Sequence, residues 1–457
     1  MNILKSETAA GPKILLTDSN RWSLSARLAM SLAQAGCQVS AICPTPGHPL
    51  LKTRNVYRTY HYSGLRPIQS LIAAIEAADP DVVIPCCDRS VGHLHELYAL
   101  AQRRGAAGSK LATLIERSLG APASHATVSS RYDLLTLASD EGIRVPGSGR
   151  LNTAEELSSW LAQEPFPWVL KADGTWGGCG VKMVHNADEV QRSFAALNRV
   201  FGFRQALKRL LVNRDSFWLR DWRSRSRHSF VAQSYIQGRP ANCGVFCWKG
   251  RVLAGFGVEV VISEGLTGPA SVVRVVDNPE MMFAAERIAA RLNLSGFFGL
   301  DFMIEDGSGA AYLIEMNPRC TPLTHLRLSE GRDLVGALWA QLAGQPLPET
   351  EPLTHNELIA YFPPPVDKEN AVLQASFHDV PQDEPELIEE LQQPWLNRTF
   401  LYRLLLGLGR LKGKPANPAQ SIELKTYPTS DDFGPGSDKD SNVLRTEPLV
   451  NAGVRSR

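Results

Sequence analysis

Short apolar runs and helix-like apolar spacings alternate along the first 120 residues. The alternation predicts strands at 14–17, 39–43 and 81–85 and helices at 23–35 and 67–78. Gly36 supplies the stop of the first helix, and the run 81–85 is apolar throughout, which is typical of a strand buried in a parallel sheet. We therefore expect a loose tail at 1–12 and then a small doubly wound α/β domain over 13–125.

The turn after the first predicted strand decides against one common use of such a domain. It reads Thr17-Asp18-Ser19-Asn20-Arg21 and contains no glycine. A dinucleotide site needs glycines where the backbone approaches the pyrophosphate. The sequence thus favours a scaffold whose loops help to shape a substrate pocket over an NAD site.

A glycine-rich hairpin follows in the second part of the chain. Lys171 ends a predicted strand at 168–171, a loop with Gly177, Gly178 and Gly180 comes next, and a second strand covers 181–184. Successive glycines let backbone N–H groups close over phosphate oxygens, and the lysine can add a fixed positive charge. The loop opens a strand, whereas a Walker A loop opens a helix, so it predicts a different kind of phosphate loop.

An acidic hairpin is predicted around Ser308. Two strand-like runs, 299–305 and 312–319, flank a polar turn, and this register sets Asp301 opposite Glu315. Asn317 would share their face, and the Cβ atoms of the two acids would lie about 5 Å apart. Two carboxylates at that distance repel unless a proton or a cation sits between them, and oxygen ligands of this kind suit Mg²⁺. The hairpin therefore predicts metal-dependent phosphate chemistry.

The remaining patterns set the expected domain boundaries. The segments that we expect are a main domain at 126–345 with a basic insertion at 199–229, a small C-terminal extension at 346–413 and a disordered tail at 414–457. Within the main domain, strands are predicted at 230–236, 242–248 and 252–262, and helices at 131–141, 279–292 and 331–343. We interpret the insertion as a solvated helical segment, with a site for an anionic substrate or nucleic acid, or a flexible lid, as the alternatives.

The composition of the chain limits which partners and which cellular compartment we expect. The 48 basic and 47 acidic side chains of the 457-residue chain leave a net charge of +1, so no global field recruits nucleic acid or a membrane. No run reaches the roughly 20 apolar residues of a membrane span. The 8 cysteines are scattered without a CxxC pair, which favours a reducing cytoplasm over a disulfide framework or a zinc site. The oligomeric state is left open.

The order of these pieces resembles the ATP-grasp superfamily, and within it the carbamoyl-phosphate synthase and biotin carboxylase branch. Asp301 followed by Glu315-Met316-Asn317-Pro318-Arg319 is similar to the acidic strand and the E-x-N-P-R motif of that branch. The resemblance implies an α/β and α+β architecture: a Rossmann-like pre-ATP-grasp domain, then a two-subdomain ATP-grasp fold and a small C-terminal extension. It also implies ATP and Mg²⁺, with Mn²⁺ as an alternative, as cofactors.

The resemblance assigns roles to single residues. Asp301, Glu315 and Asn317 would hold the metal between ATP phosphates, and Arg319 would face the carboxylate or acyl phosphate. Lys171 and the loop glycines would cover the triphosphate. The backbone of the segment Gln233, Ser234, Tyr235 and Ile236 would pair with adenine. Arg131 stands at the position of a phosphate-binding lysine. Arginine keeps the charge there but changes the donor geometry.

Three functions fit these features. The first is an ATP- and Mg²⁺-dependent ligase that activates a small carboxylate as an acyl phosphate for attack by an amine. The second is activation of bicarbonate to carboxyphosphate, although the sequence has no Ala-Met-Lys-Met biotin signal and no duplicated synthase half. The third is an ATP-binding regulatory or scaffold module without turnover, against which the intact acid pair argues.

Overall fold

The computed structural model describes the greater part of the chain. The described residues are 11–44, 47–172, 180–200, 229–265, 268–328, 332–350, 357–364, 370–392 and 424–426, the last segment and 197–200 by their backbone alone. Residues 201–228 of the predicted basic insertion, the loop glycines Gly177 and Gly178 and most of the predicted disordered tail lie outside the described residues. All described residues belong to one packed unit that spans Met1–Tyr427.

The N-terminal part is a parallel α/β domain, as the apolar runs predicted. Its four strands are β1 (Lys13–Thr17), β2 (Gln38–Cys43), β3 (Arg58–His61) and β4 (Val82–Pro85), in the spatial order β3-β2-β1-β4. The helices are α1 (Ser23–Gln34), α2 (Pro67–Ala78), α3 (Asp88–Arg103) and α4 (Ser109–Leu119). β1 lies between β2 and β4, so the loops that follow β1 and β4 meet at the carboxyl edge of the sheet, where ligands of such sheets bind.

Short elements connect this domain to the rest of the chain. They are the 3₁₀ helices η1 (Pro49–Leu51), η2 (Gly105–Gly108) and η3 (Pro122–Ser124), followed by α5 (His125–Val128) and α6 (Arg131–Asp140). α6 begins where the side chain of Ser130 accepts a hydrogen bond from the backbone N–H of Asp133. This cap places Arg131 in the first turn of α6, at the start of the next structural unit.

A small antiparallel sheet follows. Its strands are β5 (Ser148–Arg150), β6 (Trp168–Ala172), β7 (Val181–Val184) and β8 (Phe230–Ser234), in the order β5-β8-β6-β7, with α7 (Ala154–Gln163) and α8 (Ala187–Val200) nearby in the chain. A capping box of Thr153 and Glu156 begins α7. Trp160 and Trp168 contribute to the separate apolar core of this sheet. The glycine-rich hairpin that the sequence predicted is formed by β6 and β7.

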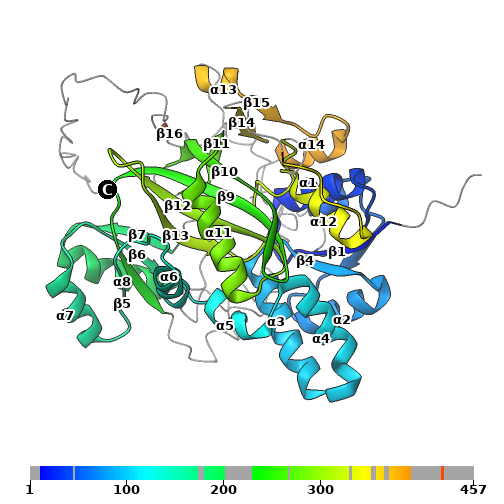
Figure 1. The fold of residues 1–457 in the computed structure, drawn as a ribbon, viewed down its shortest axis with the longest axis horizontal. Coiled ribbons are helices and arrows are strands. Elements are labelled where there is room, and N and C mark those ends of the chain that lie inside the picture. Colours follow the sequence, from blue (N-terminus) through cyan, green and yellow to red (C-terminus); the bar gives the residue numbers. More distant parts are fainter. Residues whose placement is uncertain are drawn as a thin grey trace, which may run out of the picture. The chain divides into compact units, whose positions relative to one another are not determined.

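A larger sheet forms the centre of the molecule (Figure 1). Its strands are β9 (Gly238–Trp248), β10 (Arg251–Glu264), β11 (Ala270–Val276), β12 (Gly296–Glu305), β13 (Ala311–Asn317), β14 (Leu358–Tyr361), β15 (Phe377–Asp379) and β16 (Leu424–Thr426). The order is β13-β12-β9-β10-β11-β14-β15, and β16 pairs with β10. β16 lies inside the segment that the sequence predicted to be disordered.

The two faces of the large sheet bury different cores. α11 (Pro279–Leu292) packs on one face, where Ile288 and Phe302 share an apolar cluster. On the other face, Phe256 of β10 lies in the same cluster as Leu16 of β1 and Leu338 of α12 (Leu334–Ala343). The N-terminal domain therefore shares its core with the large sheet.

The acidic hairpin has the predicted register at its functional end only. Asp301 pairs with Glu315 and Gly299 with Asn317, as predicted, but Met303 pairs with Tyr312 and not with Leu313. The shift comes from a β-bulge in β13, which leaves one residue more between the acids and the turn on that strand than on β12.

The C-terminal extension adds to the large sheet and to the N-terminal domain. Its elements are β14, α13 (Ala371–Ala375), β15 and α14 (Pro385–Gln392). β14 pairs with β11 and β15 with β14, which extends the sheet past β11. Leu387 and Leu391 of α14 pack against Ala26 and Met30 of α1.

Candidate functional site

A cavity of about 860 Å³ lies between the N-terminal domain, the small sheet and the large sheet. The predicted site residues that line it are Arg131, Lys171, Gln233, Ser234, Tyr235, Ile236, Asp301, Glu315, Asn317 and Arg319. Gly180 is buried next to this region, where its carbonyl accepts the N–H of Ala172, and it is not among the lining residues. The tertiary structure thus brings together residues that lie far apart in the chain.

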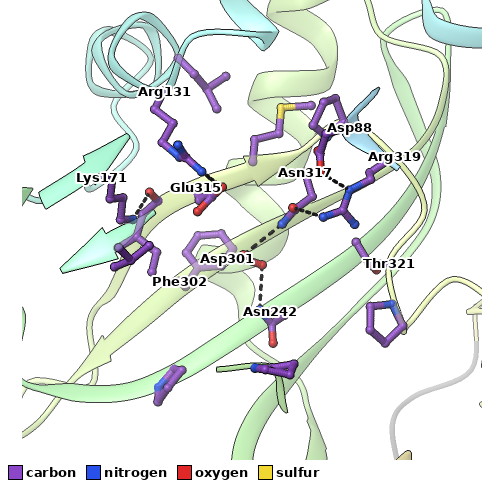
Figure 2. Close-up of a pocket in the computed structure, with 18 of the residues that line it drawn as sticks. Asp88, Arg131, Lys171, Asn242, Asp301, Phe302, Glu315, Asn317, Arg319 and Thr321 are labelled. Carbon is purple, nitrogen blue, oxygen red and sulfur yellow. Dashed lines mark hydrogen bonds and ion pairs between the residues drawn. The ribbon is translucent and has the colours of Figure 1, made fainter. Parts of the chain in front are cut away.

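Asp301 is held by two neutral amides. Nδ2 of Asn242 donates to Oδ1 at 2.7 Å, and Nδ2 of Asn317 donates to Oδ2 at 3.0 Å (Figure 2). Burial, together with the neighbouring Glu315 carboxylate, raises the pKa of Asp301 to about 6. The two amides fix the carboxylate in place but do not neutralise it.

Glu315 is held by a cation instead. Nη2 and Nε of Arg131 donate to Oε1 at 2.7 and 3.2 Å, and Nη1 of Arg131 donates to the carbonyl of Ala172 at 2.7 Å. Burial by itself would raise the pKa of Glu315, but Arg131 and Lys171 outweigh it and keep the pKa below its usual value. Arg131 therefore links one of the paired acids to the last residue of β6, directly before the glycine-rich loop.

The bulge in β13 gives Lys171 its partner. Nζ of Lys171 donates to the carbonyl of Ile314 at 3.0 Å, and Nε2 of Gln233 donates to the same carbonyl at 3.2 Å. Ile314 is the residue that the bulge leaves out of the β12 pairing. Burial lowers the pKa of Lys171 to about 8, although Glu315 opposes this shift. The small sheet thus contacts the acidic hairpin through two side chains on one carbonyl.

The predicted adenine segment lies at the end of β8. The backbone N–H of Ser234 donates to Gly147 at 2.8 Å, and that of Tyr235 donates to Pro167 at 3.3 Å. The N–H of Ile236 has no backbone partner within the described part of the chain. In this segment, the backbone N–H of Ile236 is therefore the one that is available to donate a hydrogen bond to the edge of a base.

Arg319 is anchored on several sides. Its Nε donates to Oδ2 of Asp88 at 2.9 Å, its Nη2 to Oδ1 of Asn317 at 3.0 Å and its Nη1 to the carbonyl of Cys320 at 3.2 Å. The guanidinium also lies over the ring of Trp22, 5.6 Å from its centre. Burial would lower the pKa of Arg319, but Asp88 and other neighbours raise it above its ordinary value.

Sequence reasoning missed several residues of this site, and four of them are Trp22, Asp88, Asn242 and Tyr361. All four line the cavity. Asp88 was open to prediction, because it follows the strand at 81–85 closely and the carboxyl edge of a parallel sheet is where ligands bind. Asn242, Trp22 and Tyr361 carry no motif, so only the fold identifies them.

The donor set fits a hard cation. Asp301, Glu315 and Asn317 present carboxylate and amide oxygens on one hairpin, and the pKa of Asp301 is raised because its carboxylate is buried beside a second carboxylate. In the described part of the chain, no three His, Cys, Asp or Glu side chains form a metal cluster. Two carboxylates and an amide leave coordination positions for phosphate oxygens and water, which is how Mg²⁺ is usually bound.

Comparison with known proteins agrees with this geometry. A family model described as an ATP-grasp domain matches residues 211–322, which include the whole acidic hairpin. The chain contains an ATP-grasp domain. No match is found among curated proteins.

Solved structures share the fold of the ATP-grasp domain and of the N-terminal domain before it. Biotin carboxylase from Campylobacter jejuni, in a βγ-ATP complex, has a TM-score of 0.53 at 16% identity and covers 75% of this chain and 73% of its own. N5-carboxyaminoimidazole ribonucleotide synthetase from Thermus thermophilus has a TM-score of 0.52 at 14% identity and covers 76% of this chain and 81% of its own. The third example is the biotin carboxylase domain of Hydrogenobacter thermophilus 2-oxoglutarate carboxylase with MgADP, ADP and bicarbonate. It has a TM-score of 0.52 at 17% identity and covers 74% of this chain and 71% of its own.

These likenesses confirm the predicted architecture of a Rossmann-like N-terminal domain and an ATP-grasp fold. Among the described residues of the ATP-grasp protein, no helix has the length and apolar character needed to cross a membrane. The roles of the individual site residues and the domain boundaries stay predictions.

Proposed function

We propose that this ATP-grasp protein is an ATP- and Mg²⁺-dependent ligase that activates a carboxylate as an acyl phosphate, which an amine then attacks. One observation carries the proposal: the acid pair, Arg131 bound to one of the acids, Lys171 bound to the bulged carbonyl of the same hairpin, and the anchored Arg319 line the same cavity. Phosphoryl transfer needs alignment and charge neutralisation more than covalent help from the protein. No nucleophilic serine or cysteine is required.

The residues divide this work. Asp301, Glu315 and Asn317 would hold Mg²⁺, which supplies charge neutralisation on the ATP phosphates when bound. Buried Lys171 and partly buried Arg131 would be the cations on the phosphate side, where low polarity strengthens their effect on a transferring group. The amide of Ile236 would bind the adenine edge.

Arg319 would orient the carboxylate. Its guanidinium is held by Asp88 and Asn317, so it is rigid before a substrate arrives. A rigid guanidinium loses little conformational freedom when it binds a carboxylate. Asn317 contacts both Asp301 and Arg319, which sets the proposed metal site and the proposed substrate site next to each other.

Bicarbonate activation is the second candidate. It is supported by the similar structures, two of which are biotin carboxylases, one of them in complex with bicarbonate. In both candidates an acid is phosphorylated by ATP, and the candidates differ in the acid and in the acceptor. The same residues serve either reaction.

A substrate-dependent ADP-release screen tests the proposal. ADP and phosphate that form only when an acid and an amine are both present support ligation, whereas dependence on bicarbonate alone supports carboxyphosphate formation. Nucleotide binding without turnover across the screen contradicts both and favours a regulatory module.

The metal assignment has its own test. We expect Glu315→Gln to lower ADP formation about 10²-fold or more, because it removes a charge from the proposed metal site. Glu305→Gln is the matched control, since Glu305 lies at the other end of the same hairpin and does not line the cavity. Circular dichroism checks that both variants fold, and normal turnover in Glu315→Gln would refute the assignment.

A further inference from the structure

Three carboxylates of the C-terminal extension are buried. Asp379, Glu384 and Glu390 are exposed to 8%, 3% and 4% of their areas. A buried carboxylate is costly unless charged or hydrogen-bonding partners compensate for the lost water. The partners of these three acids therefore show what the extension holds in place.

Glu390 holds the loop that follows β1. Nη2 of Arg21 donates to both Oε1 and the backbone carbonyl of Glu390, each at 2.9 Å, and Nε of Arg21 donates to Gly47 at 3.0 Å. The next residue is Trp22, which lines the cavity and whose ring lies under the guanidinium of Arg319. A contact made by α14 thus fixes the position of an aromatic wall of the cavity.

Asp379 holds the segment that follows Arg319. Its Oδ2 is 2.6 Å from Nε2 of His325, and its Oδ1 accepts a hydrogen bond from Arg27 of α1. In the sheet, Asp379 pairs with Tyr361, another residue that lines the cavity. Burial would raise the pKa of Asp379, but His325 and Arg27 keep it below its usual value.

Each of these two contacts holds a chain segment that is connected to Arg319. Trp22 reaches its guanidinium from the N-terminal domain, and His325 lies six residues after it in the chain. Arg21, next to Trp22, and His325 are both bound by acids of the segment 377–392, which itself does not line the cavity. We propose that residues 377–392 position Arg319 and Trp22 through Glu390 and Asp379, and so shape the acid-binding side of the cavity.

Glu384 provides a matched control within the same segment. Its Oε1 accepts hydrogen bonds from Nδ2 of Asn55 at 2.7 Å, from Oγ1 of Thr53 at 3.0 Å and from the N–H of Arg54 at 3.1 Å. None of these three partners lines the cavity. Glu384 is as deeply buried as Glu390 but anchors a different loop, so its loss should cost stability without moving Arg319.

Hydrogen exchange of the full-length protein tests the structural part. We expect Glu390→Gln to raise amide exchange in residues 19–24, and Asp379→Asn to raise it in residues 319–326, each about tenfold or more. Glu384→Gln should raise exchange around residues 53–55 and leave both of those segments unchanged. Arg21→Lys, which keeps the charge but cannot donate in the same geometry, tests the same link if Glu390→Gln does not fold. Wild-type exchange at 19–24 and 319–326 in these variants would overturn the proposal.

The catalytic consequence rests on the proposed function and has a separate readout. With an acid identified by the ADP-release screen, Glu390→Gln and Asp379→Asn should raise the KM for that acid about tenfold and leave the KM for ATP unchanged. Glu384→Gln should change neither. Equal effects of all three variants on both KM values would contradict positioning. If no acid supports turnover, the proposed function fails, while the exchange result still decides the structural part.

Discussion

Two carboxylates that face each other in one hairpin have different surroundings. Asp301 is bound by two neutral amides and its pKa is raised to about 6, whereas Glu315 is bound by Arg131 and its pKa is lowered. The difference comes from the partners, because both side chains are partly buried on the same strand pair. Arg131 forms an ion pair with Glu315, whereas the hydrogen bonds to Asp301 come from neutral amides, which makes the carboxylate of Asp301 the better candidate for binding a cation.

The lowered pKa of Lys171 predicts a pH dependence of nucleotide binding. Burial sets this pKa at about 8, so the ammonium that would bind a phosphate is lost as the pH rises through 8. We expect the affinity for MgADP, measured by titration calorimetry, to be highest near pH 7 and to fall about tenfold or more by about pH 9.5.

Two variants control this measurement. Lys171→Gln should bind MgADP more weakly at every pH and lose the dependence near pH 8. Lys182→Gln removes an exposed lysine from the neighbouring strand β7 and should keep the wild-type profile. A wild-type affinity that is flat across this pH range would show that Lys171 does not bind the nucleotide in its charged form.

The same group affects stability in the opposite direction. A lysine in the unfolded chain stays protonated up to its ordinary pKa of 10.5, whereas folded Lys171 loses its proton near 8. Between these values the unfolded state binds more protons, so the contribution of Lys171 to the free energy of unfolding rises with pH. Loss of nucleotide affinity in that range is therefore not explained by unfolding through this residue.

At the scale of elements, the hairpin of β12 and β13 contacts the small sheet because its pairing is irregular. The bulge at Ile314 removes one carbonyl from the β12 pairing, and that carbonyl accepts hydrogen bonds from Lys171 and Gln233 of the small sheet. A regular hairpin would use this carbonyl within its own ladder or direct it elsewhere. The bulge thus connects the proposed phosphate-binding residues of the small sheet to the proposed metal-binding hairpin.

Gly299 of β12 predicts a steric limit on the same hairpin. A Cβ atom there would lie 2.5 Å from Cγ2 of Thr321 and 3.3 Å from the carbonyl of Cys243, so Thr321 would have to move. We expect Gly299→Ala to lower the free energy of unfolding by about 1–3 kcal/mol through overpacking, as measured by urea denaturation.

Gly92 in α3 is the matched control for this substitution. A Cβ atom at Gly92 meets nothing within 4 Å, and the residue is helical. Gly92→Ala should therefore raise the free energy of unfolding by about 0.5–1 kcal/mol. If Gly299→Ala were as stable as the wild type, Thr321 and the segment around it would be able to move aside without loss of stability.

At the scale of the whole molecule, the cavity joins parts that are not neighbours in sequence. Trp22 and Asp88 come from the N-terminal domain, Lys171 from the small sheet, Asp301 from the large sheet and Tyr361 from the C-terminal extension. A ligand that contacts several of these parts binds the folded protein and not the unfolded chain. Ligand binding should therefore stabilise the whole unit.

This arrangement predicts a metal-dependent thermal shift. At a MgADP concentration of about 100 times its Kd, we expect a gain of about 2.7 kcal/mol and a rise in Tm of a few degrees, measured by differential scanning calorimetry. ADP with a chelator should give a smaller rise. Asp301→Asn should remove the difference between the two conditions, and Asp277→Asn, which changes an exposed carboxylate away from the cavity, should preserve it. The same rise with and without metal would contradict the metal assignment.

The sequence by itself determined the elements whose signals are local. The acids pair because Asp301 and Glu315 lie fourteen residues apart around one turn, and Lys171 enters the site because it lies near the end of the strand before the glycines. Backbone geometry decides such features within a few residues, so hydrophobic spacing and turn composition are enough to predict them.

Only the tertiary structure decided the partners that come from distant segments. Asp88 binds Arg319 across 231 positions, Asn242 binds Asp301 across 59, and Glu390 binds Arg21 across 369. The bulge that moved the hairpin register by one residue also left no sign in the spacing of apolar positions. These contacts depend on which surfaces pack together, and packing is set by the shapes of whole elements and not by any single stretch of the chain. The sequence therefore predicted a phosphate and metal site, and the fold determined what surrounds Arg319.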